Sequence, residues 1–181
     1  MTTLAITCAS DGVLSIVAPL ALAAAAGTAL VVDMDPHGPE YPGSGSLAEL
    51  VEQGPRLDDL RPSRSGIAVL RNGGIDPVAA RDVIAALAAG WPRVVLRLGE
   101  GADGEGRHTV PVVPLLPGGM TPRCDRPAVY QQVGWRLKAP GPGLTIGTPS
   151  RSAVTALLEG RLPTWSRWVR GWRQVWETPW V

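Results

Sequence analysis

A run of twenty uncharged residues near the start of the chain places the strongest constraint on its fold. Residues 13–32 read VLSIVAPLALAAAAGTALVV, and an aspartate stands close to each end. A run of this length could cross a membrane or form the core of a signal peptide. However, no Arg or Lys precedes it, much of it is alanine, and Gly27 divides it. We therefore expect a buried helix over 13–26 and a buried strand over 29–33, rather than a membrane segment.

Further apolar segments alternate between strand-like and helix-like patterns along the chain. The expected strands are 4–8, 67–70, 94–98, 110–116 and 144–146, and the expected helices are 47–53, 76–89 and 150–159. Prolines interrupt 110–116, so we expect this strand to be short or near an edge of the sheet. The alternation predicts βαβ units, that is, an α/β fold with a mostly parallel sheet flanked by helices. The loops after the strands (8–12, 33–38 and 98–106) then meet at one edge, where ligands of such sheets bind.

The composition argues against several classes of protein. With 181 residues, of which 45% are hydrophobic, the chain is long enough to bury a core and too apolar to be disordered. A formal net charge of +1 argues against a globally basic nucleic-acid-binding protein. The two cysteines, Cys8 and Cys124, and the two histidines, His37 and His108, are isolated, so they offer neither a disulfide framework nor metal-site spacing. We expect no metal, no cofactor and no nucleic-acid partner.

Three stretches resemble the ParA/MinD-type ATPases, the deviant-Walker proteins that position chromosomes, plasmids, septa and secretion or pilus machines. LAITCASDGV lies at 4–13, and GTALVVDMDPHGP at 27–39 contains an apolar strand that ends in Asp-Met-Asp-Pro-His-Gly. The family has Asp-Pro-Gln-Gly one residue after the aspartate that ends this strand. WPRVVLRLGEG at 91–101 stands where the family has its Walker B strand. The resemblance covers about residues 3–120 and implies a P-loop NTPase-like fold.

The phosphate loop departs from the family pattern, which is Lys-Gly-Gly-Val-Gly-Lys-Thr-Thr. In a match made forward along the chain, Ser10 and Asp11 replace the first lysine and glycine, while Gly12 agrees. Leu14 replaces the last glycine, and Ser15 replaces the second lysine. Such a loop presents backbone N–H groups and a lysine to the phosphates. Here the lysine is missing, and the carboxylate of Asp11 would repel the phosphates.

The Walker B position also departs from the family. Arg97 stands where the family has an acid, and an arginine cannot hold Mg²⁺. Asp33 and Asp35 match the family's aspartates, but without phosphate and magnesium they have no catalytic role. We therefore expect a degenerate, non-catalytic nucleotide site with no catalytic residue. The alternatives are an unrelated α/β domain and a nucleotide-binding ATPase with an unorthodox phosphate loop.

The end of the chain carries an unusual concentration of tryptophan. Five of the seven tryptophans lie in the last 17 residues: Trp165, Trp168, Trp172, Trp176 and Trp180. Their spacing of three or four residues predicts a helix over 163–180 with one bulky apolar face, and arginines lie beside or opposite that face. We therefore divide the chain into an α/β domain, 1–160, and a Trp-rich amphipathic helix, 161–181.

This apolar face has three possible destinations: the chain's own core, a membrane interface, or a partner or second copy. The family resemblance supports the membrane, because MinD proteins have a C-terminal amphipathic membrane helix. The area that four tryptophans offer, about 600–1,000 Å², matches one side of a standard protein interface. We expect Trp165, Trp168, Trp172 and Trp176 to bind a protein partner or a second copy. The expected function is that of a cytoplasmic scaffold or regulator in localisation, division or secretion-type machinery, with the inner membrane face as an alternative site.

Overall fold

A seven-stranded parallel sheet forms the centre of the protein. The computed structural model describes residues 2–8, 12–56, 59–60, 62, 65–99, 101–102, 104, 106–118 and 120–180. The strands are β1 (Thr2–Cys8), β2 (Thr28–Asp33), β3 (Gly66–Leu70), β4 (Arg93–Leu98), β5 (Thr109–Leu115), β6 (Ala128–Gln132) and β7 (Gly143–Ile146). They lie in the order β3-β2-β4-β1-β5-β6-β7, and every neighbouring pair is parallel. The predicted parallel α/β sheet is confirmed.

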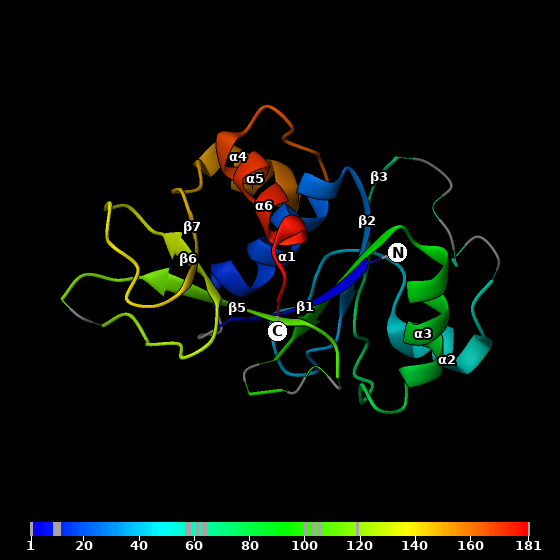
Figure 1. Ribbon diagram of the computed structural model, residues 1–181. Helices are drawn as coiled ribbons and strands as arrows, with labels where there is room; N and C mark the ends of the chain where they lie inside the picture. Colours follow the sequence, from blue (N-terminus) through cyan, green and yellow to red (C-terminus); the bar gives the residue numbers. More distant parts are fainter. Residues whose placement is uncertain are drawn as a thin grey trace.

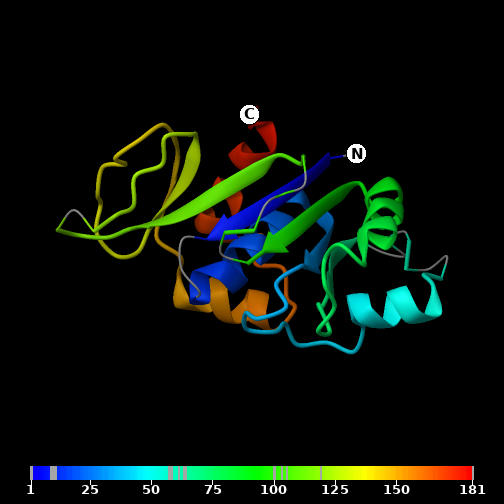
Figure 2. The ribbon, with the colours of Figure 1, turned by 90° about the horizontal axis from the view of Figure 1, so that it is seen from below.

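Helices cover both faces of this sheet (Figures 1 and 2). They are α1 (Val13–Ala26), α2 (Leu47–Gln53), α3 (Arg81–Gly90), α4 (Arg151–Leu158), α5 (Arg167–Gly171) and α6 (Arg173–Glu177). Side chains alternate between faces along each strand, so Ile6 and Val31 pack with α1 and α4–α6, while Ala5 and Leu30 pack with α2 and α3. The chain therefore has a large core on the α1 face and a second core on the α2–α3 face.

The uncharged run of 13–32 folds as its sequence predicts. It forms α1 and most of β2, and Gly27 between them has a φ of 82°, which favours glycine. Within the described part of the chain, no helix is both long and apolar enough to span a membrane. The helix predicted over 47–53 is also present, and Ser46 and Glu49 cap its start reciprocally.

Strand β5 is an interior strand, which corrects our expectation of a short or edge strand. It spans Thr109–Leu115 between β1 and β6, although it contains Pro111 and Pro114. The pairing with β1 covers 109–112 and the pairing with β6 covers 112–115. Each proline therefore has a partner strand on one side only, so its missing N–H group can face the side without a partner.

Strand β6 was not predicted from the sequence. Its residues, AVYQQ, are all buried, and they include the polar pair Gln131 and Gln132. Among the described residues between β5 and β7 there is no helix: 116–118, 120–127 and 133–142 are loops on either side of β6. These loops supply Cys124 and Leu137 to a small third cluster around Tyr130, on the face of the sheet opposite α1. This end of the sheet is therefore covered by loops on one face.

Candidate functional site

Two of the predicted site residues meet at the carboxyl ends of neighbouring strands. Asp33 ends β2, and Arg97 is its direct partner in the register of β2 with β4. Val31 and Val95, two residues earlier on the same strands, belong to the core on the α1 face. Because side chains alternate along a strand, Asp33 and Arg97 also point to that face. The pair therefore lies on the side where α1 begins.

Arg97 joins both predicted aspartates in a buried ion cluster. Its Nη1 lies 3.0 Å from Oδ2 of Asp33, and its Nη2 lies 3.1 Å from Oδ2 of Asp35. Nη1 also donates to the carbonyl of Pro39 at 2.6 Å. The side chains of Arg97, Asp33 and Asp35 are 1%, 0% and 7% exposed. One guanidinium therefore pairs with two carboxylates almost out of contact with water.

The loop after β2 supplies the other hydrogen bonds of the two carboxylates. Oδ1 of Asp33 accepts from the backbone N–H of Asp35, and Oδ1 of Asp35 accepts from those of His37 and Gly38, at 2.9–3.1 Å. A Cβ atom at Gly38 would collide with Asp35 Oδ2 and Arg97 Nη2. Glycine at this position therefore allows the loop to close over the ion cluster.

Tyr41 and Asn72 complete the surroundings of the cluster, and sequence reasoning missed both. The guanidinium carbon of Arg97 lies 5.5 Å from the ring centre of Tyr41, a cation–π arrangement. The hydroxyl of Tyr41 donates to the carbonyl of Ile16 in α1 at 2.9 Å. Asn72 Nδ2 donates to the carbonyl of Asp33 at 3.4 Å. Tyr41 lies in a segment rich in proline and glycine, which is typical of a loop, so no local signal distinguished it.

Burial shifts the protonation of two groups in this region. It raises the pKa of Asp33 to about 6, although the positive charge of Arg97 acts in the opposite direction. Burial also raises the pKa of Tyr41 well above its ordinary value, so this hydroxyl keeps its proton. Asp33 therefore releases its proton at a higher pH than an ordinary aspartate.

The predicted phosphate-loop residues are only partly described. Ser10 and Asp11 lie outside the described residues. Gly12 is the N-cap of α1, and the hydroxyl of Ser15 donates to its carbonyl at 2.8 Å. Ser15 is buried and its donor is used inside the first turn of the helix. Ser15 therefore stabilises the start of α1.

The cluster leaves its carboxylates little capacity to hold a metal ion. Among the residues that the structure describes, no three His, Cys, Asp or Glu side chains are grouped as a metal site. Asp33 and Asp35, the pair with the right chemistry for a hard cation, already hold Arg97. The arrangement is a closed internal salt bridge with hydrogen bonds on both carboxylates.

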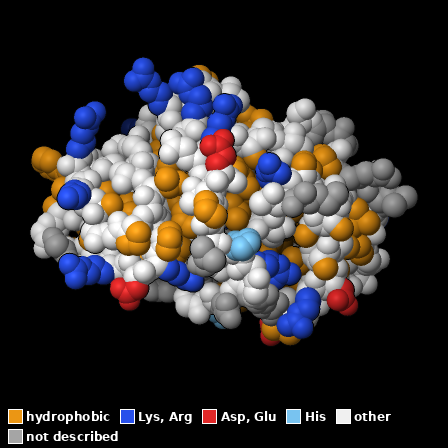
Figure 3. Space-filling model, in the orientation of Figure 1, with side chains coloured by type: hydrophobic (Ala, Val, Ile, Leu, Met, Phe, Trp, Pro, Cys, Tyr) orange, Lys and Arg blue, Asp and Glu red, His pale blue; other side chains and the backbone are white. Residues whose placement is uncertain are grey.

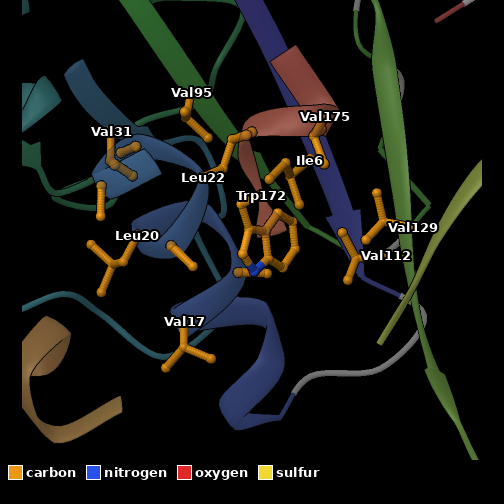
Figure 4. Packing of buried hydrophobic residues seen from close by; sticks show 14 of the residues in the cluster. Ile6, Val17, Leu20, Leu22, Val31, Val95, Val112, Val129, Trp172 and Val175 are labelled. Atoms are coloured by element: carbon orange, nitrogen blue, oxygen red, sulfur yellow. The ribbon is translucent and has the colours of Figure 1, made fainter. Parts of the chain in front are cut away.

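The tryptophan tail packs into the core on the α1 face. It forms two short helices, α5 and α6, rather than the single helix predicted, and Trp172 stands between them with a φ of −70° and a ψ of −12°. Trp172 is 0% exposed. Figure 4 shows its ring between Leu20 and Leu22 of α1 and the side chains of Ile6 and Val112 on the sheet.

Other tryptophans of the tail are fixed by polar contacts inside the chain. Nε1 of Trp168 donates to Oε1 of the buried Gln131 at 2.8 Å, and Nε1 of Trp176 donates to the carbonyl of Leu22 at 2.9 Å. Trp168 and Trp172 meet edge to face, with ring centres 6.4 Å apart. Of the three destinations considered for this face, the chain's own core is therefore the one that Trp168 and Trp172 take. Trp165 is 60% exposed, so its contact with a partner stays a prediction.

Neither the models of known protein families nor the curated proteins give a match to this chain. The resemblance to ParA/MinD-type ATPases therefore stays a prediction from the sequence.

Proposed function

We propose that the protein is a non-catalytic, ParA/MinD-like scaffold or regulator that acts by binding other proteins. In this proposal it serves localisation, division or secretion-type machinery from the cytoplasm or from the inner face of the membrane. Its P-loop NTPase-like fold holds a nucleotide site that has lost its chemistry. The observation that carries the proposal is the buried bond of Arg97 to both Asp33 and Asp35.

This ion cluster supports the loss of nucleotide chemistry for an energetic reason. Magnesium bound at Asp33 and Asp35 would have to displace Arg97 and leave its guanidinium buried without a carboxylate partner. Removing one partner from a buried ion pair costs about 3–5 kcal/mol. A guanidinium has no acceptor atom, so Arg97 cannot itself coordinate the metal. In this protein the arginine takes the place of the cation that the family binds.

The closure of the loop after β2 supports the same proposal. The carbonyl of Pro39 accepts from Arg97, and the hydroxyl of Tyr41 holds the carbonyl of Ile16. The segment between β2 and α2 is thus tied both to β4 and to the first turn of α1. Access of a phosphate group to the α1 side of Asp33 would require these bonds to break.

Calorimetric titration with ATP and Mg²⁺ tests the proposal. We expect no saturable heat at micromolar nucleotide and no release of phosphate over time. The control is the variant Glu52→Ala, which removes an exposed carboxylate of α2. Saturable binding that Asp33→Ala abolishes and Glu52→Ala preserves would contradict the proposal. It would favour the alternative, an ATPase with an unorthodox phosphate loop.

A further inference from the structure

A groove lies between helix α4 and the segment 161–165, which leads from this helix to α5. Its volume is about 760 Å³, within the usual range of ligand sites. One wall is a face of α4 that includes Arg151, Ser152 and Thr155, and the other wall is the segment 161–165. No residue of the Asp33–Asp35–Arg97 cluster lines it, so this groove is separate from the degenerate nucleotide site.

Hydrogen bonds hold the second wall in place. Gly160, with a φ of 71°, turns the chain after α4, and the N–H of Arg161 donates to the carbonyl of Ala156 at 2.8 Å. At the other end, the N–H of Ser166 donates to the carbonyl of Pro163 at 2.9 Å, and the side chain of Ser166 caps α5. The groove therefore exists before a ligand arrives, which lowers the entropy cost of binding.

The inner surface of the groove is largely apolar. Ala156, Leu162 and Pro163 contribute to it, together with Trp165. The side chain of Trp165 is 60% exposed, so most of its ring is free to contact a ligand. An aromatic ring beside aliphatic side chains suits an apolar group of the ligand.

The groove has an arginine at each end. Arg151 is the first residue of α4, whereas Nε of Arg161 lies 3.0 Å from Oε2 of Glu159, the C-cap of the same helix. Residues 151 and 159 are about 12 Å apart at about 1.5 Å per helical residue. Both groups of the Arg161–Glu159 pair are more than half exposed, and such ion pairs are weak. Arg161 is therefore kept at the far end of α4 and can still bind a second carboxylate.

The surroundings of the groove are positively charged. Residues 147–180 carry five arginines and two acids, and all seven side chains are exposed. Helix α1, against which α4 packs, has no charged residue, and no acid is among the described residues that line the groove. In Figure 3, Lys and Arg gather along the upper edge of the molecule, where Figure 1 places α4–α6. The ligand is therefore expected to be anionic.

We propose that this groove binds an extended acidic segment of a partner protein, with the pattern acid–x–apolar–x–acid. In an extended chain alternate side chains point to the same side, and four residues cover about 13 Å. Acids at the first and fifth positions thus meet Arg151 and Arg161, and the apolar side chain between them meets the surface beside Trp165. The hydroxyls of Ser152 and Thr155 bind the backbone of the segment. This inference deepens the proposed function and rests on it, because it gives the chemistry of the protein partner.

The geometry favours a peptide over other anionic ligands. Single-stranded nucleic acids stack successive bases on several aromatic rings, whereas Trp165 is the one aromatic side chain among the described residues of the groove. A bilayer contacts side chains that protrude, whereas this ring lines a hollow. A single phosphate group would draw two guanidiniums together, whereas Glu159 holds that of Arg161 at the opposite end of α4 from Arg151.

Fluorescence anisotropy of labelled peptides is the first test. The probe is Ser-Glu-Ser-Phe-Ser-Glu-Ser, blocked at both ends, and it is expected to bind saturably at low ionic strength and more weakly in added salt. The same peptide with glutamine for both glutamates is expected to bind at least about tenfold more weakly, because charge-assisted hydrogen bonds are lost. The peptide Ser-Ser-Glu-Glu-Phe-Ser-Ser has the same composition, and it is expected to bind more weakly because adjacent acids cannot reach both arginines.

Paired arginine variants locate the site. Arg151→Gln/Arg161→Gln is expected to weaken binding of the probe about tenfold or more. Arg170→Gln/Arg173→Gln removes the same charge from exposed positions outside the groove, and it is the matched control. The control is expected to change the affinity by less than about threefold, through long-range attraction alone. Circular dichroism and thermal unfolding confirm that each variant is folded.

Tryptophan variants test the apolar contact. Trp165→Ala is expected to weaken binding about tenfold, because tryptophan is a common hot-spot residue, whereas Trp135→Ala, also exposed, is expected to leave it unchanged. In a Trp135→Phe background the probe is expected to shift the tryptophan emission to shorter wavelength, since the ring of Trp165 leaves water. Adding Trp165→Phe is expected to abolish this shift.

Several results would overturn this inference. They are no saturable binding of the probe at up to about 1 mM protein, equal binding of the glutamine peptide, and equal losses in the two paired arginine variants. Tighter binding of oligothymidylate or of anionic phospholipid vesicles that Arg151→Gln/Arg161→Gln abolishes would also overturn it, and would assign the groove to a nucleic acid or a membrane. ATP binding that Asp33→Ala abolishes would defeat the proposed function, but it concerns a separate site and leaves the peptide results standing.

Discussion

The tripeptide Gly-Trp-Arg occurs twice in this chain, at 134–136 and at 171–173, and its two copies have opposite environments. Trp172 lies between two short helices and is 0% exposed, whereas Trp135 stands on a loop and is 71% exposed. Gly171 stands near Ile146 inside the packing, whereas Gly134 has a φ of 142°, in the region that favours glycine. The tryptophan of the same tripeptide thus serves as core in one place and as surface in the other.

The difference shows that a high local density of tryptophan does not by itself mark a binding surface. The tail supplies large rings to a core in which six of the fourteen residues of α1 are alanine, and these small side chains leave room for the rings. The loop after β6 has no such wall beside it, so its one tryptophan remains in water.

Replacing Trp172 by alanine is expected to give the largest loss of stability. The substitution opens a cavity between α1 and the sheet, and such changes cost about 3–5 kcal/mol in the free energy of unfolding. Urea unfolding followed by circular dichroism measures the loss. A loss below about 1 kcal/mol would mean that α5 and α6 are not part of the cooperative core, and the contrast with Trp135 would fail.

The sequence predicted the elements that have strong local signals. The helix over 13–26 and the strand that ends at Asp33 follow from an uncharged apolar run with a glycine in it. Strand β6 was missed because only the first three of its five residues have the apolar character of a buried strand. Its two glutamines look like loop residues, yet Gln131 is buried by bonds to Trp168 and to the carbonyl of Gly147.

The sequence singled out three residues of the candidate site, but it did not predict the ion pairs between them. Asp33, Asp35 and Arg97 were each selected by the resemblance to the ParA/MinD-type ATPases. Their ion cluster depends on the register of β2 with β4, which joins residues 64 positions apart and leaves no local trace. The sequence led us to expect a partner for the tail, whereas Trp168 and Trp172 lie in the core, because the spacing defines a face but not what that face touches.

Replacing Arg97 by methionine tests whether the buried ion cluster contributes as much to stability as the buried tryptophan tail does. It leaves two carboxylates buried without their cation, and removing one partner of a buried pair costs about 3–5 kcal/mol. Without Arg97 the pKa of Asp33 rises further above 6, because the charge that lowers it is gone. The loss of stability is therefore expected to be larger at about pH 8 than at about pH 5.

The triple variant Arg97→Met/Asp33→Asn/Asp35→Asn is the control for this prediction. It removes the charges together, so no unpaired charge is left in the interior, and its stability is expected to recover much of the loss with little dependence on pH. If Arg97→Met alone were as stable as the wild type at both pH values, the cluster would not neutralise buried charge as described.

Asp33 itself gives a smaller, pH-dependent effect. Between about pH 4 and pH 6 the folded carboxyl keeps a proton that the unfolded chain has released, because burial raises its pKa to about 6. Its stabilising contribution is therefore present at low pH and is lost as the pH rises through 6. Relative to Asp33→Asn, the free energy of unfolding of the wild type is expected to fall by about 3 kcal/mol from about pH 4 to about pH 7.

The measurement for Asp33 is a series of urea unfolding curves at several pH values. Glu52→Gln, which also removes one negative charge but on an exposed turn of α2, is the control for a general effect of net charge. A constant difference between the wild type and Asp33→Asn across this range would show that Asp33 does not titrate there.

Replacing Trp135 by alanine is expected to change stability least. The ring is 71% exposed, and substitutions at exposed positions that lack special contacts change the free energy of unfolding by about 0.5 kcal/mol or less. Its loop is closed by Gln132 and the backbone of Leu137, neither of which needs the indole. Urea unfolding of dilute protein, where any self-association is absent, gives this value beside that of Trp172→Ala. A loss above about 2 kcal/mol would mean that Trp135 packs within its own chain, and the two copies of Gly-Trp-Arg would then no longer differ in kind.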